Sequence, residues 1–254
     1  MIHGTAIIDP SASLAEDVHI GPYCVIGAQV EIGAGTRVDS HVVINGPTRI
    51  GRNNRIAQFN SIGDDPQDKK FNNQPTVLEI GDNNVIREFC TFNRGTNGGG
   101  GVTRIGDDNW IMAYVHVAHD CVVGNQITMA NGSTLAGHVQ VDDFVTLGAF
   151  TIVHQFCAVG AHAFSAMGTV VFKDVPPYLM IAGNPAKPHG LNSEGLKRRR
   201  FEREVTLELK RAYKSLYRHA LSLEHALAVL DAQDCEQVGE MAAFVRASTR
   251  GIVR

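Results

Sequence analysis

Residues 14–44 read LAEDVH IGPYCV IGAQVE IGAGTR VDSHVV I, with an aliphatic residue at the start of each group of six. Counting outward in steps of six, this position is aliphatic eleven times in succession: Ile2, Ile8, Leu14, Ile20, Ile26, Ile32, Val38, Ile44, Ile50, Ile56 and Ile62. The step resumes at Ile80 and again from Ile105 to Val159. A period of six does not fit an α-helix, which repeats every 3.6 residues (about two turns in seven residues). It does not fit an ordinary strand either, because side chains there alternate between two faces.

A six-residue unit of this kind describes one short strand and one corner of a β-solenoid. The aliphatic residue points inward, a turn former such as Gly21 or Gly27 often follows it, and the fourth residue after it is small or β-branched. Three units make a triangular coil of 18 residues, and successive coils stack at about 4.8 Å. Residues 18 apart in an uninterrupted stretch are therefore expected to lie above one another.

The repeat is interrupted twice, and a solenoid accommodates extra residues only as loops extruded from a corner. The first insertion, around 64–75, carries Gln67, Asp68 and Lys70. The second, 96–101, reads TNGGGG and is expected to be a flexible loop. Loops on a rigid scaffold often carry function, but the glycine loop also fits a merely tolerated insertion.

A helical pattern replaces the six-residue step beyond residue 186. Apolar residues between 209 and 216 recur at spacings of three and four, which is typical of an amphipathic helix. We therefore predict a mostly β protein, with a β-helix domain over 1–186 and a C-terminal α-helical domain over 187–254. The basic run 197–200 in the second domain fits either a solvated helix face or a phosphate site.

The composition excludes several classes of protein. The 254 residues include 23 Lys and Arg against 26 Asp and Glu, a formal charge of −3, which gives no strong attraction to nucleic acid or to anionic membranes. No apolar stretch approaches the roughly 18 residues of a membrane helix, and the N-terminus has no signal-peptide pattern. We expect a globular protein that neither spans a membrane nor is secreted.

Four of the five cysteines occupy the small inward slot of a hexad: Cys24, Cys90, Cys121 and Cys157. They fit as small core residues. An odd number of cysteines without a CxxC pair favours free thiols in a reducing compartment, so we predict a cytoplasmic protein.

Eleven histidines are many for this length, and five of them fall between 116 and 162. Hexads that begin at Val117, Leu135 and Val153 are 18 apart, so they share one face of the solenoid. They bring together a polar, titratable cluster: Asn93, His119, Asp120, Gly137, His138, His154 and Gln155. A single histidine at a corner commonly does no more than hydrogen-bond the turn, but a cluster on successive coils predicts a site.

His119 next to Asp120 is the pair with the clearest chemistry. A histidine beside a carboxylate acts as a general base whose imidazolium is stabilised as it forms. Gly137 in the same column lets a backbone N–H approach a developing oxyanion. The combination predicts acyl transfer. Metal binding is the competing use of clustered histidines, and whether His116 and His119 converge on one ion stays open.

Several segments carry a resemblance to one family: Gln67-Asp68-Lys69-Lys70, Ala118-His119-Asp120-Cys121, Leu135-Ala136-Gly137-His138, Val153-His154-Gln155-Phe156, Gly160-Ala161-His162 and Glu194-Gly195-Leu196-Lys197-Arg198-Arg199. In this order they resemble the UDP-N-acetylglucosamine O-acyltransferases that begin lipid A synthesis in Gram-negative bacteria, which are hexapeptide-repeat enzymes. The resemblance is continuous from the first hexad to Ser248-Thr249-Arg250-Gly251.

The resemblance implies a left-handed parallel β-helix, a homotrimer with active sites between adjacent solenoids, and transfer of a (R)-3-hydroxyacyl group from acyl carrier protein to the sugar 3-position. The acyl group would arrive on the phosphopantetheine of the carrier protein, with no further cofactor and no metal. His119 would be the general base, Asp120 its orienting partner and Gly137 the oxyanion donor. The residues implied to bind substrate are Gln67, Asp68, Lys70, Asn93, His116, His138, His154, Gln155, Asn192, Glu194, Arg198 and Arg199. The resemblance therefore favours a phosphate site in the basic run.

Two positions bear on specificity. The family commonly has histidine in a Thr-x-His-Arg-Gly segment where this chain has Asn93, so the acceptor atom, a 3-hydroxyl or a 3-amino group, stays open. In the family, a residue at the position of Met167 stops the acyl chain. Three coils give a groove of about 14 Å, so Met167 predicts a chain near ten carbons unless it is ordinary core filling.

Two other functions remain open at this point. The γ-type carbonic anhydrases use the same solenoid and bind zinc through histidines shared across a subunit boundary, which would make this chain a metal-dependent lyase. A structural solenoid without activity is the third possibility. It would be expected to show regular surface ladders instead of interrupting loops and clustered titratable groups.

Overall fold

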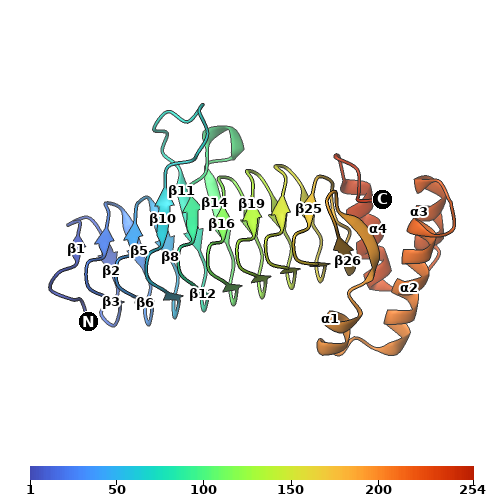
Figure 1. Cartoon of the computed structure of the whole chain (residues 1–254), viewed down its shortest axis with the longest axis horizontal. Helices are drawn as coiled ribbons and strands as arrows, with labels where there is room; N and C mark the ends of the chain where they lie inside the picture. Colours follow the sequence, from blue (N-terminus) through green and yellow to red (C-terminus); the bar gives the residue numbers. More distant parts are fainter.

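Three parallel sheets, wound by one continuous chain, form the longer part of the molecule (Figure 1). The computed structural model describes all residues from 1 to 254. Each coil contributes one short strand to each of three faces, which we number 1 to 3 in the order in which the chain meets them. The parallel β-helix predicted from the six-residue step is thereby confirmed.

The faces consist of strands that are mostly two to four residues long. Face 1 contains β1 (Ile7–Ile8), β4 (Val25–Ile26), β7 (Val43–Ile44), β10 (Ser61–Asp64), β13 (Thr91–Asn93), β16 (His116–Val117), β19 (Thr134–Leu135), β22 (Ile152–Val153) and β25 (Val170–Val171). Face 2 contains β2 (Ser13–Leu14), β5 (Val30–Ile32), β8 (Thr48–Ile50), β11 (Val77–Ile80), β14 (Val102–Ile105), β17 (Val122–Val123), β20 (Gln140–Val141) and β23 (Ala158–Val159). Face 3 contains β3 (His19–Ile20), β6 (Arg37–Val38), β9 (Arg55–Ile56), β12 (Val85–Ile86), β15 (Trp110–Ile111), β18 (Thr128–Met129), β21 (Thr146–Leu147), β24 (Phe164–Ser165), β26 (Leu179–Ala182) and β27 (Lys187–Leu191).

The spacing of 18 residues sets the register of the whole prism. Val117 pairs with Leu135, 18 positions further along the chain. Ile62 pairs with Phe92, and Phe92 pairs with Val117, which are 30 and 25 positions apart. Both predicted insertions are therefore extruded between faces 1 and 2, and the repeat resumes after each of them. The second loop contains a short 3₁₀ turn, Asn97–Gly99.

The core of the prism consists of the hexad aliphatics and small residues. Ile20, Ile44 and Leu135 have no exposed surface. The four hexad cysteines are buried free thiols, as predicted. Burial raises the pKa of Cys90 and of Cys157 to about 11, so both thiols stay protonated at neutral pH.

We name the three corners after the faces that they join: 1/2, 2/3 and 3/1. At the 3/1 corner one residue in each coil has a positive φ, and five of these residues form a row of rings: Tyr23, His41, Phe59, Phe89 and Tyr114. Neighbouring ring centroids in this row lie 5.0 to 5.3 Å apart. A positive φ is unfavourable for a residue with a side chain, and the stacking of the rings offsets part of that cost.

A row of buried amides runs along the 2/3 corner. Asn54, Asn84 and Asn109 lie one above another with no more than 1% of their surface exposed. Each amide oxygen accepts a backbone N–H of the next coil at 2.8 to 2.9 Å, and each amide nitrogen donates to a glycine carbonyl at 2.8 to 3.0 Å. The row therefore satisfies backbone polar groups on the inner side of this corner.

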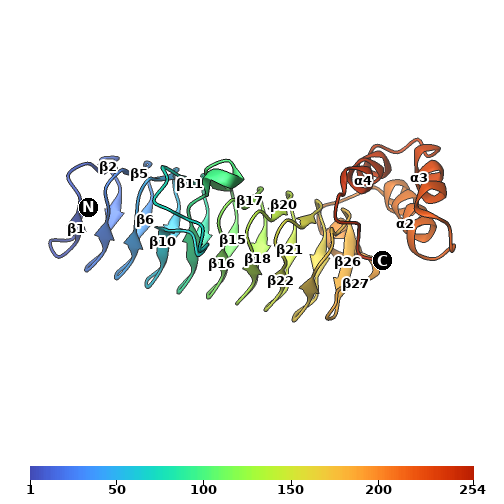
Figure 2. The ribbon, with the colours of Figure 1, turned by 90° about the horizontal axis from the view of Figure 1, so that it is seen from above.

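The chain leaves the prism through β26 and β27, which pair antiparallel. Four helices follow: α1 (Ser193–Arg198), α2 (Arg203–Tyr217), α3 (Leu223–Asp231) and α4 (Glu236–Ala247). Figure 2 shows α2, α3 and α4 together at one end of the prism, beyond its last coils. The predicted domain boundary between 186 and 187 falls between β26 and β27, and the first helix begins at Ser193. None of the helices combines the length and the apolar character that a membrane crossing requires.

Replacing Asn84 by Ala should lower the free energy of unfolding by about 2 to 5 kcal/mol, because it leaves the buried Asn109 N–H without an acceptor and the partly buried Gly106 carbonyl without a donor. Asn131→Ala is the matched control. Asn131 is exposed at the 3/1 corner and its side chain makes no hydrogen bond, so the change should stay within about 0.5 kcal/mol. Denaturant unfolding of both variants measures the difference, and equal losses would contradict a stabilising role for the row.

Candidate active site

The sequence-predicted pair His119 and Asp120 lies at the 1/2 corner, between β16 and β17. His119 Nδ1 is 2.8 Å from Asp120 Oδ2, and the Asp120 side chain is fully buried. Since a carboxylate only accepts hydrogen bonds, Nδ1 carries the proton and Nε2 is free to take one. The pair therefore has the geometry of an oriented general base.

The glycine loop holds the Asp120 carboxylate from the other side. The Thr96 N–H donates to Oδ1 at 2.8 Å, and the Thr96 hydroxyl donates to Oδ2 at 2.6 Å. Gly99 lies so close that a Cβ there would be 2.0 to 2.4 Å from the carboxylate atoms. The second insertion thus holds the carboxylate that orients His119 and is more than a tolerated loop. Sequence reasoning missed Thr96 and Gly99, for which the only signal was the run TNGGGG.

Gly137 lies against the His119 ring. A Cβ at Gly137 would be 2.6 Å from His119 Cε1, so a side chain at this position would displace the imidazole. The Gly137 N–H makes no hydrogen bond within the chain. The structure therefore brings the predicted base and the predicted oxyanion donor together, with the donor unpaired.

Two further histidines flank His119. The His138 ring meets the His119 ring edge-on, with centroids 5.2 Å apart, and stacks on Phe156. His116 Nδ1 lies 2.7 Å from the Thr91 hydroxyl. Burial lowers the pKa of both His116 and His138. Both imidazoles are therefore neutral at neutral pH and do not oppose protonation of His119.

Asn93 is buried at the end of β13, in the coil next to that of His119. Its Nδ2 donates to the Asp65 carbonyl at 2.9 Å, which fixes the orientation of the amide. Its Oδ1 is buried and has no hydrogen-bond partner. Since buried acceptors are rarely left unpaired, this oxygen is suited to a donor on a ligand.

The first insertion rises from the same corner as the glycine loop, and Figure 1 shows the two loops side by side. Arg94, just after β13, forms an ion pair with Asp65 in the first loop. This loop carries Gln67, Asp68 and Lys70, of which Asp68 accepts the Lys70 N–H at 3.0 Å. The predicted loop residues therefore stand beside the histidines.

His154 and Gln155 lie at the 1/2 corner, one coil beyond Gly137. Gln155 is exposed and His154 is partly buried. The structure thus gathers most of the predicted site residues at one corner: Gln67, Asp68, Lys70, Asn93, His116, His119, Asp120, Gly137, His138, His154 and Gln155.

His119, Asp120 and His138 are the group whose possible metal-ligand atoms lie within 4.8 Å of one another. Both Asp120 oxygens already accept hydrogen bonds from Thr96, and one also accepts from His119 Nδ1. Three of the four lone-pair positions of this carboxylate are thus occupied, which leaves a cation one position on Oδ1. The donor set therefore fits a hydrogen-bonded dyad better than a metal site.

A second group of predicted residues lies at the start of the helical domain. Asn192 caps α1, because its Oδ1 accepts the Gly195 N–H at 3.0 Å, and its Nδ2 donates to the His162 carbonyl at 2.9 Å. The Arg199 guanidinium lies 3.9 Å from the centroid of the Phe144 ring. These contacts fix α1 against the 2/3 corner.

A cavity of about 470 Å³ opens between α1 and face 3. Asn192, Glu194 and Arg198 line it together with Thr146 and Phe164. The corner that carries His119 is opposite face 3 in the triangular prism. Within one chain the structure does not bring this second group to the general base.

Met167 lies at the 3/1 corner between β24 and β25, and 74% of its surface is exposed. It is therefore not core filling. It lies three coils beyond His119 along the prism but at a different corner. The two residues do not share a groove within one chain.

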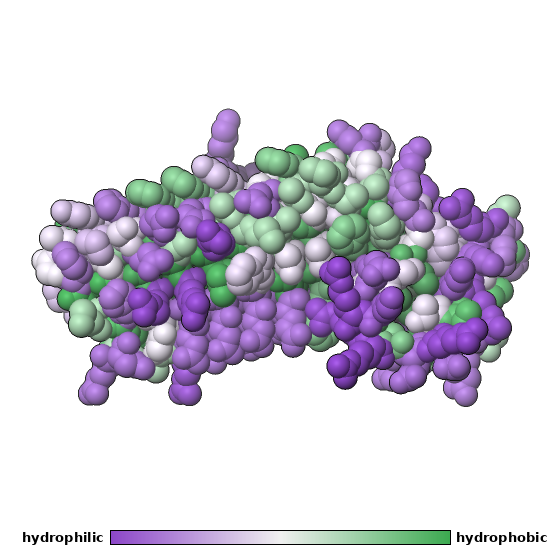
Figure 3. Space-filling model, turned by 60° about the horizontal axis from the view of Figure 1, so that its bottom comes forward, coloured by the Kyte–Doolittle hydropathy of each residue, from purple (hydrophilic) through white to green (hydrophobic).

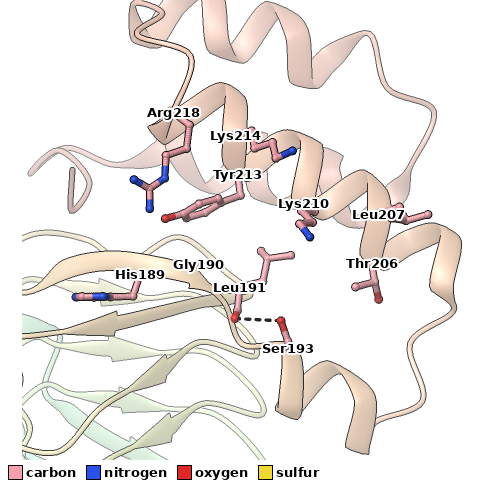
Figure 4. A pocket seen from close by; sticks show the side chains of 10 residues that line it. All are labelled: His189, Gly190, Leu191, Ser193, Thr206, Leu207, Lys210, Tyr213, Lys214 and Arg218. Atoms are coloured by element: carbon pink, nitrogen blue, oxygen red, sulfur yellow. Dashed lines mark hydrogen bonds between the residues drawn. The ribbon is translucent and has the colours of Figure 1, made fainter.

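A further cavity, of about 440 Å³, was not expected from the sequence (Figure 4). Lys210 and Lys214 line it from α2, Arg218 lines it from the cap just after α2, and His189 lines it from β27. No acidic residue lines this cavity. Its positive charge favours an anionic ligand, and the spacing of the three cations at intervals of four was the signal in the sequence.

Two family models match the chain. The model described as Udp N-acetylglucosamine O-acyltransferase, domain 2, matches residues 174–253. The model of six bacterial transferase hexapeptide repeats matches residues 1–34 and 103–137. The matches thus cover part of the prism and the helical end.

Relatives and solved structures match over the full length. The acyl-[acyl-carrier-protein]–UDP-N-acetylglucosamine O-acyltransferase of Thiobacillus denitrificans is 57% identical, over 100% of this chain and 99% of that protein, and the one of Janthinobacterium sp. is 53% identical over the same shares. The UDP-N-acetylglucosamine acyltransferase structure of Francisella novicida has a TM-score of 0.97 at 45% identity, over 100% of this chain and 94% of that one. The structure from Bacteroides fragilis has a TM-score of 0.98 at 37% identity, over 100% of both chains.

These comparisons give no support to a carbonic anhydrase or to an inactive structural solenoid. The relatives are acyltransferases by name. The Thiobacillus denitrificans protein has more than half of its residues in common with this chain. The Francisella novicida structure shares both the prism and the helical end. The chain therefore belongs to the UDP-N-acetylglucosamine O-acyltransferase family.

Proposed function

We propose that this protein transfers a (R)-3-hydroxyacyl group from acyl carrier protein to the 3-position of UDP-N-acetylglucosamine or of its 3-amino analogue, the first step of lipid A synthesis. The observation that carries this proposal is the buried Asp120, which orients His119 beside the unpaired N–H of Gly137. The names of the relatives supply the carrier protein and the nucleotide sugar.

In the proposed reaction, His119 Nε2 removes a proton from the acceptor atom as that atom attacks the carbonyl carbon of the acyl thioester. The carbonyl oxygen becomes an oxyanion, which the Gly137 N–H stabilises. Collapse of the intermediate breaks the carbon–sulfur bond, and the His119 imidazolium gives its proton to the leaving thiolate. Asp120 stays ionised and stabilises the charge on His119.

The active site is completed, in this proposal, between copies of the chain in a homotrimer. One chain carries the general base at its 1/2 corner, the second residue group beside face 3, and Met167 at its 3/1 corner. A neighbouring copy that turns its face 3 and 3/1 corner toward this 1/2 corner brings the three parts together. Because these three parts lie apart in one chain, a complete site requires neighbouring copies in the homotrimer.

Exposed apolar side chains support the same assembly. On face 1, outward-facing residues are 36% to 67% exposed, namely Ile7, Val25, Val43 and Ile152. The 3/1 corner adds exposed rings, namely Tyr23, Phe59, Phe89, Tyr114 and Phe150. Figure 3 shows apolar patches along the prism above a continuous hydrophilic belt. Extended apolar surface of this kind is usually covered by another chain.

The acyl donor is bound covalently to the phosphopantetheine of the carrier protein, so the proposed reaction uses no cofactor of its own and no metal. A cytoplasmic location fits the chemistry of the chain, because its five cysteines are all free. Free thiols are typical of a reducing compartment.

Asn93 favours an amine over a hydroxyl as the acceptor. A neutral amine has two N–H groups, so it can give one proton to His119 and donate the other to the unpaired Asn93 Oδ1. A hydroxyl has one proton, which must go to His119, and it leaves Asn93 Oδ1 without a donor. An unpaired buried acceptor costs about 1 to 3 kcal/mol. The amide therefore supports the 3-amino sugar, although the relatives are named O-acyltransferases.

His119→Ala should lower kcat by about 10² to 10⁴, because it removes the general base, while the fold and the assembly stay intact. Gly99→Ala should lower kcat by about 10², because its Cβ would displace the Asp120 carboxylate and tilt the base. Steady-state kinetics with an acyl carrier protein donor measures both effects.

Gly98→Ala is the matched control for the glycine loop, because a Cβ at Gly98 would meet nothing within 4 Å. Its kcat should equal that of the unmodified protein. Near-normal turnover of a correctly assembled His119→Ala protein would remove His119 from the mechanism. Equal effects at Gly98 and Gly99 would mean that the loop does not act through Asp120.

In direct competition between UDP-N-acetylglucosamine and its 3-amino analogue, the amide product should exceed the ester product by about 5-fold to 10²-fold. Mass spectrometry of the products gives this ratio. Asn93→His should shift the ratio toward the ester, because an imidazole N–H can donate to the oxygen of the 3-hydroxyl. Equal or better turnover of plain UDP-N-acetylglucosamine by the unmodified protein would sink the amine proposal.

Met167→Gly should shift the preferred donor from about ten carbons toward fourteen, because it removes the exposed side chain that a neighbouring copy, in the proposed trimer, brings to the groove beyond His119. Four misplaced methylenes at about 0.8 kcal/mol each correspond to selectivity of about 10². Ala149→Gly, at the same corner one coil earlier, is the control and should leave the preference unchanged. If both variants and the unmodified protein use C10 and C14 donors in the same ratio, Met167 is not the stop.

A further inference from the structure

The last residues of the chain return from the helical domain to the prism. After α4 ends, residues 248–253 run along Asp174. The Ser248 hydroxyl donates to Asp174 Oδ2 at 2.6 Å. The Asp174 N–H donates to the Gly251 carbonyl at 3.0 Å, and the Val253 N–H donates to the Asp174 carbonyl at 2.8 Å. The C-terminal segment is therefore fixed to the final coil on both sides of Arg250.

This docking places Arg250 against His154. Arg250 Nη2 lies 3.3 Å from His154 Nδ1, and Arg250 Nε is buried without a partner. The nearby Cys157 thiol is neutral, since burial raises its pKa to about 11. The Asp174 carboxylate accepts the Ser248 hydroxyl and the Ala158 N–H and forms no ion pair with Arg250. Arg250 therefore forms no ion pair within the chain, and its guanidinium lies directly against the imidazole.

Two possible hydrogen bonds compete for His154 Nδ1. A guanidinium only donates hydrogen bonds, so a hydrogen bond from Arg250 at 3.3 Å makes Nδ1 the acceptor and puts the proton on Nε2. The other partner is the Gln155 carbonyl at 3.1 Å, which requires a proton on Nδ1 and leaves Nε2 an acceptor. The two hydrogen bonds exclude each other, so the tautomer depends on which of them forms.

We propose that Arg250 is a positioning residue, which holds His154 in the neutral tautomer with a proton on Nε2 and thereby makes it a hydrogen-bond donor at the 1/2 corner. His154 lies at the same corner as His119, one coil beyond Gly137. Its Nε2–H then donates to an oxygen of the acyl donor, either the 3-hydroxyl of the acyl group or a carbonyl of the pantetheine arm. The ligand part of this inference rests on the proposed function, whereas the tautomer does not.

The tautomer is tested on the full-length protein without substrate. The ¹⁵N chemical shifts of histidine-labelled protein distinguish a protonated from an unprotonated ring nitrogen, and a His154→Gln variant identifies the His154 signals. The unmodified protein should show His154 with a protonated Nε2. Arg250→Met should move the proton to Nδ1, whereas Arg250→Lys, which still donates, should keep it on Nε2. An unchanged tautomer in Arg250→Met, or a shifted one in Arg250→Lys, overturns the proposal.

The functional part is tested by steady-state kinetics of the same variants. Arg250→Met should raise KM for the acyl carrier protein donor by about tenfold, which corresponds to one lost hydrogen bond, and leave KM for the nucleotide sugar within about twofold. Arg250→Lys should restore most of the loss. Arg246→Met is the matched control, because Arg246 pairs with the exposed Asp231 on the outside of the helical domain, and it should change neither KM.

The two measurements separate the possible failures. A rise in KM for the nucleotide sugar alone, or an equal effect of Arg246→Met, overturns a role of Arg250 on the acyl donor. The correct tautomer together with a protein that uses no acyl carrier protein donor would instead contradict the proposed function. If Arg250→Met misfolds, the tautomer of the unmodified protein decides, because a proton on Nδ1 of His154 there overturns the proposal.

Discussion

Backbone hydrogen bonds between parallel coils, at a spacing of 18 residues, are the constraint on which the rest of the molecule depends. Because every coil repeats the one below, each position of the hexad becomes a row: aliphatics inside, amides at the 2/3 corner and rings at the 3/1 corner. Extra residues can leave the prism only at a corner. Both insertions leave at the 1/2 corner, and this places two loops beside one set of histidines.

Every feature that follows from the 18-residue spacing of the coils could be predicted from the sequence. The prism, the two insertions and the stacking of His119 on Gly137 all follow from counting. The corner at which Met167 lies could be predicted in the same way. Three hexads make one coil, so two hexads share a corner only when a multiple of three separates them, and eight hexads separate Val117 from Ser165. The contacts of Thr96 and Gly99 with Asp120 could not be predicted from the sequence, because a loop that folds back on the prism does not follow the six-residue repeat. The same holds for α1, whose position is set by tertiary contacts.

The site divides its tasks among parts of different stiffness. The prism places His119, Asp120 and the free Gly137 N–H at one corner. The glycine loop holds Asp120 through Thr96, and the helical domain adds Arg198 beside face 3. Burial keeps the flanking histidines neutral, so in the proposed reaction the positive charge that forms is confined to His119. Each task is therefore given to the element whose physical character suits it.

The docking of the C-terminal segment on Asp174 has a consequence for how the molecule is made. A ribosome synthesises the prism first, and its coils can stack while the helices are still being translated. The final coil, however, is completed only by residues 248–253, which are synthesised after all four helices. A nascent chain with every histidine in place therefore still lacks Arg250 beside His154.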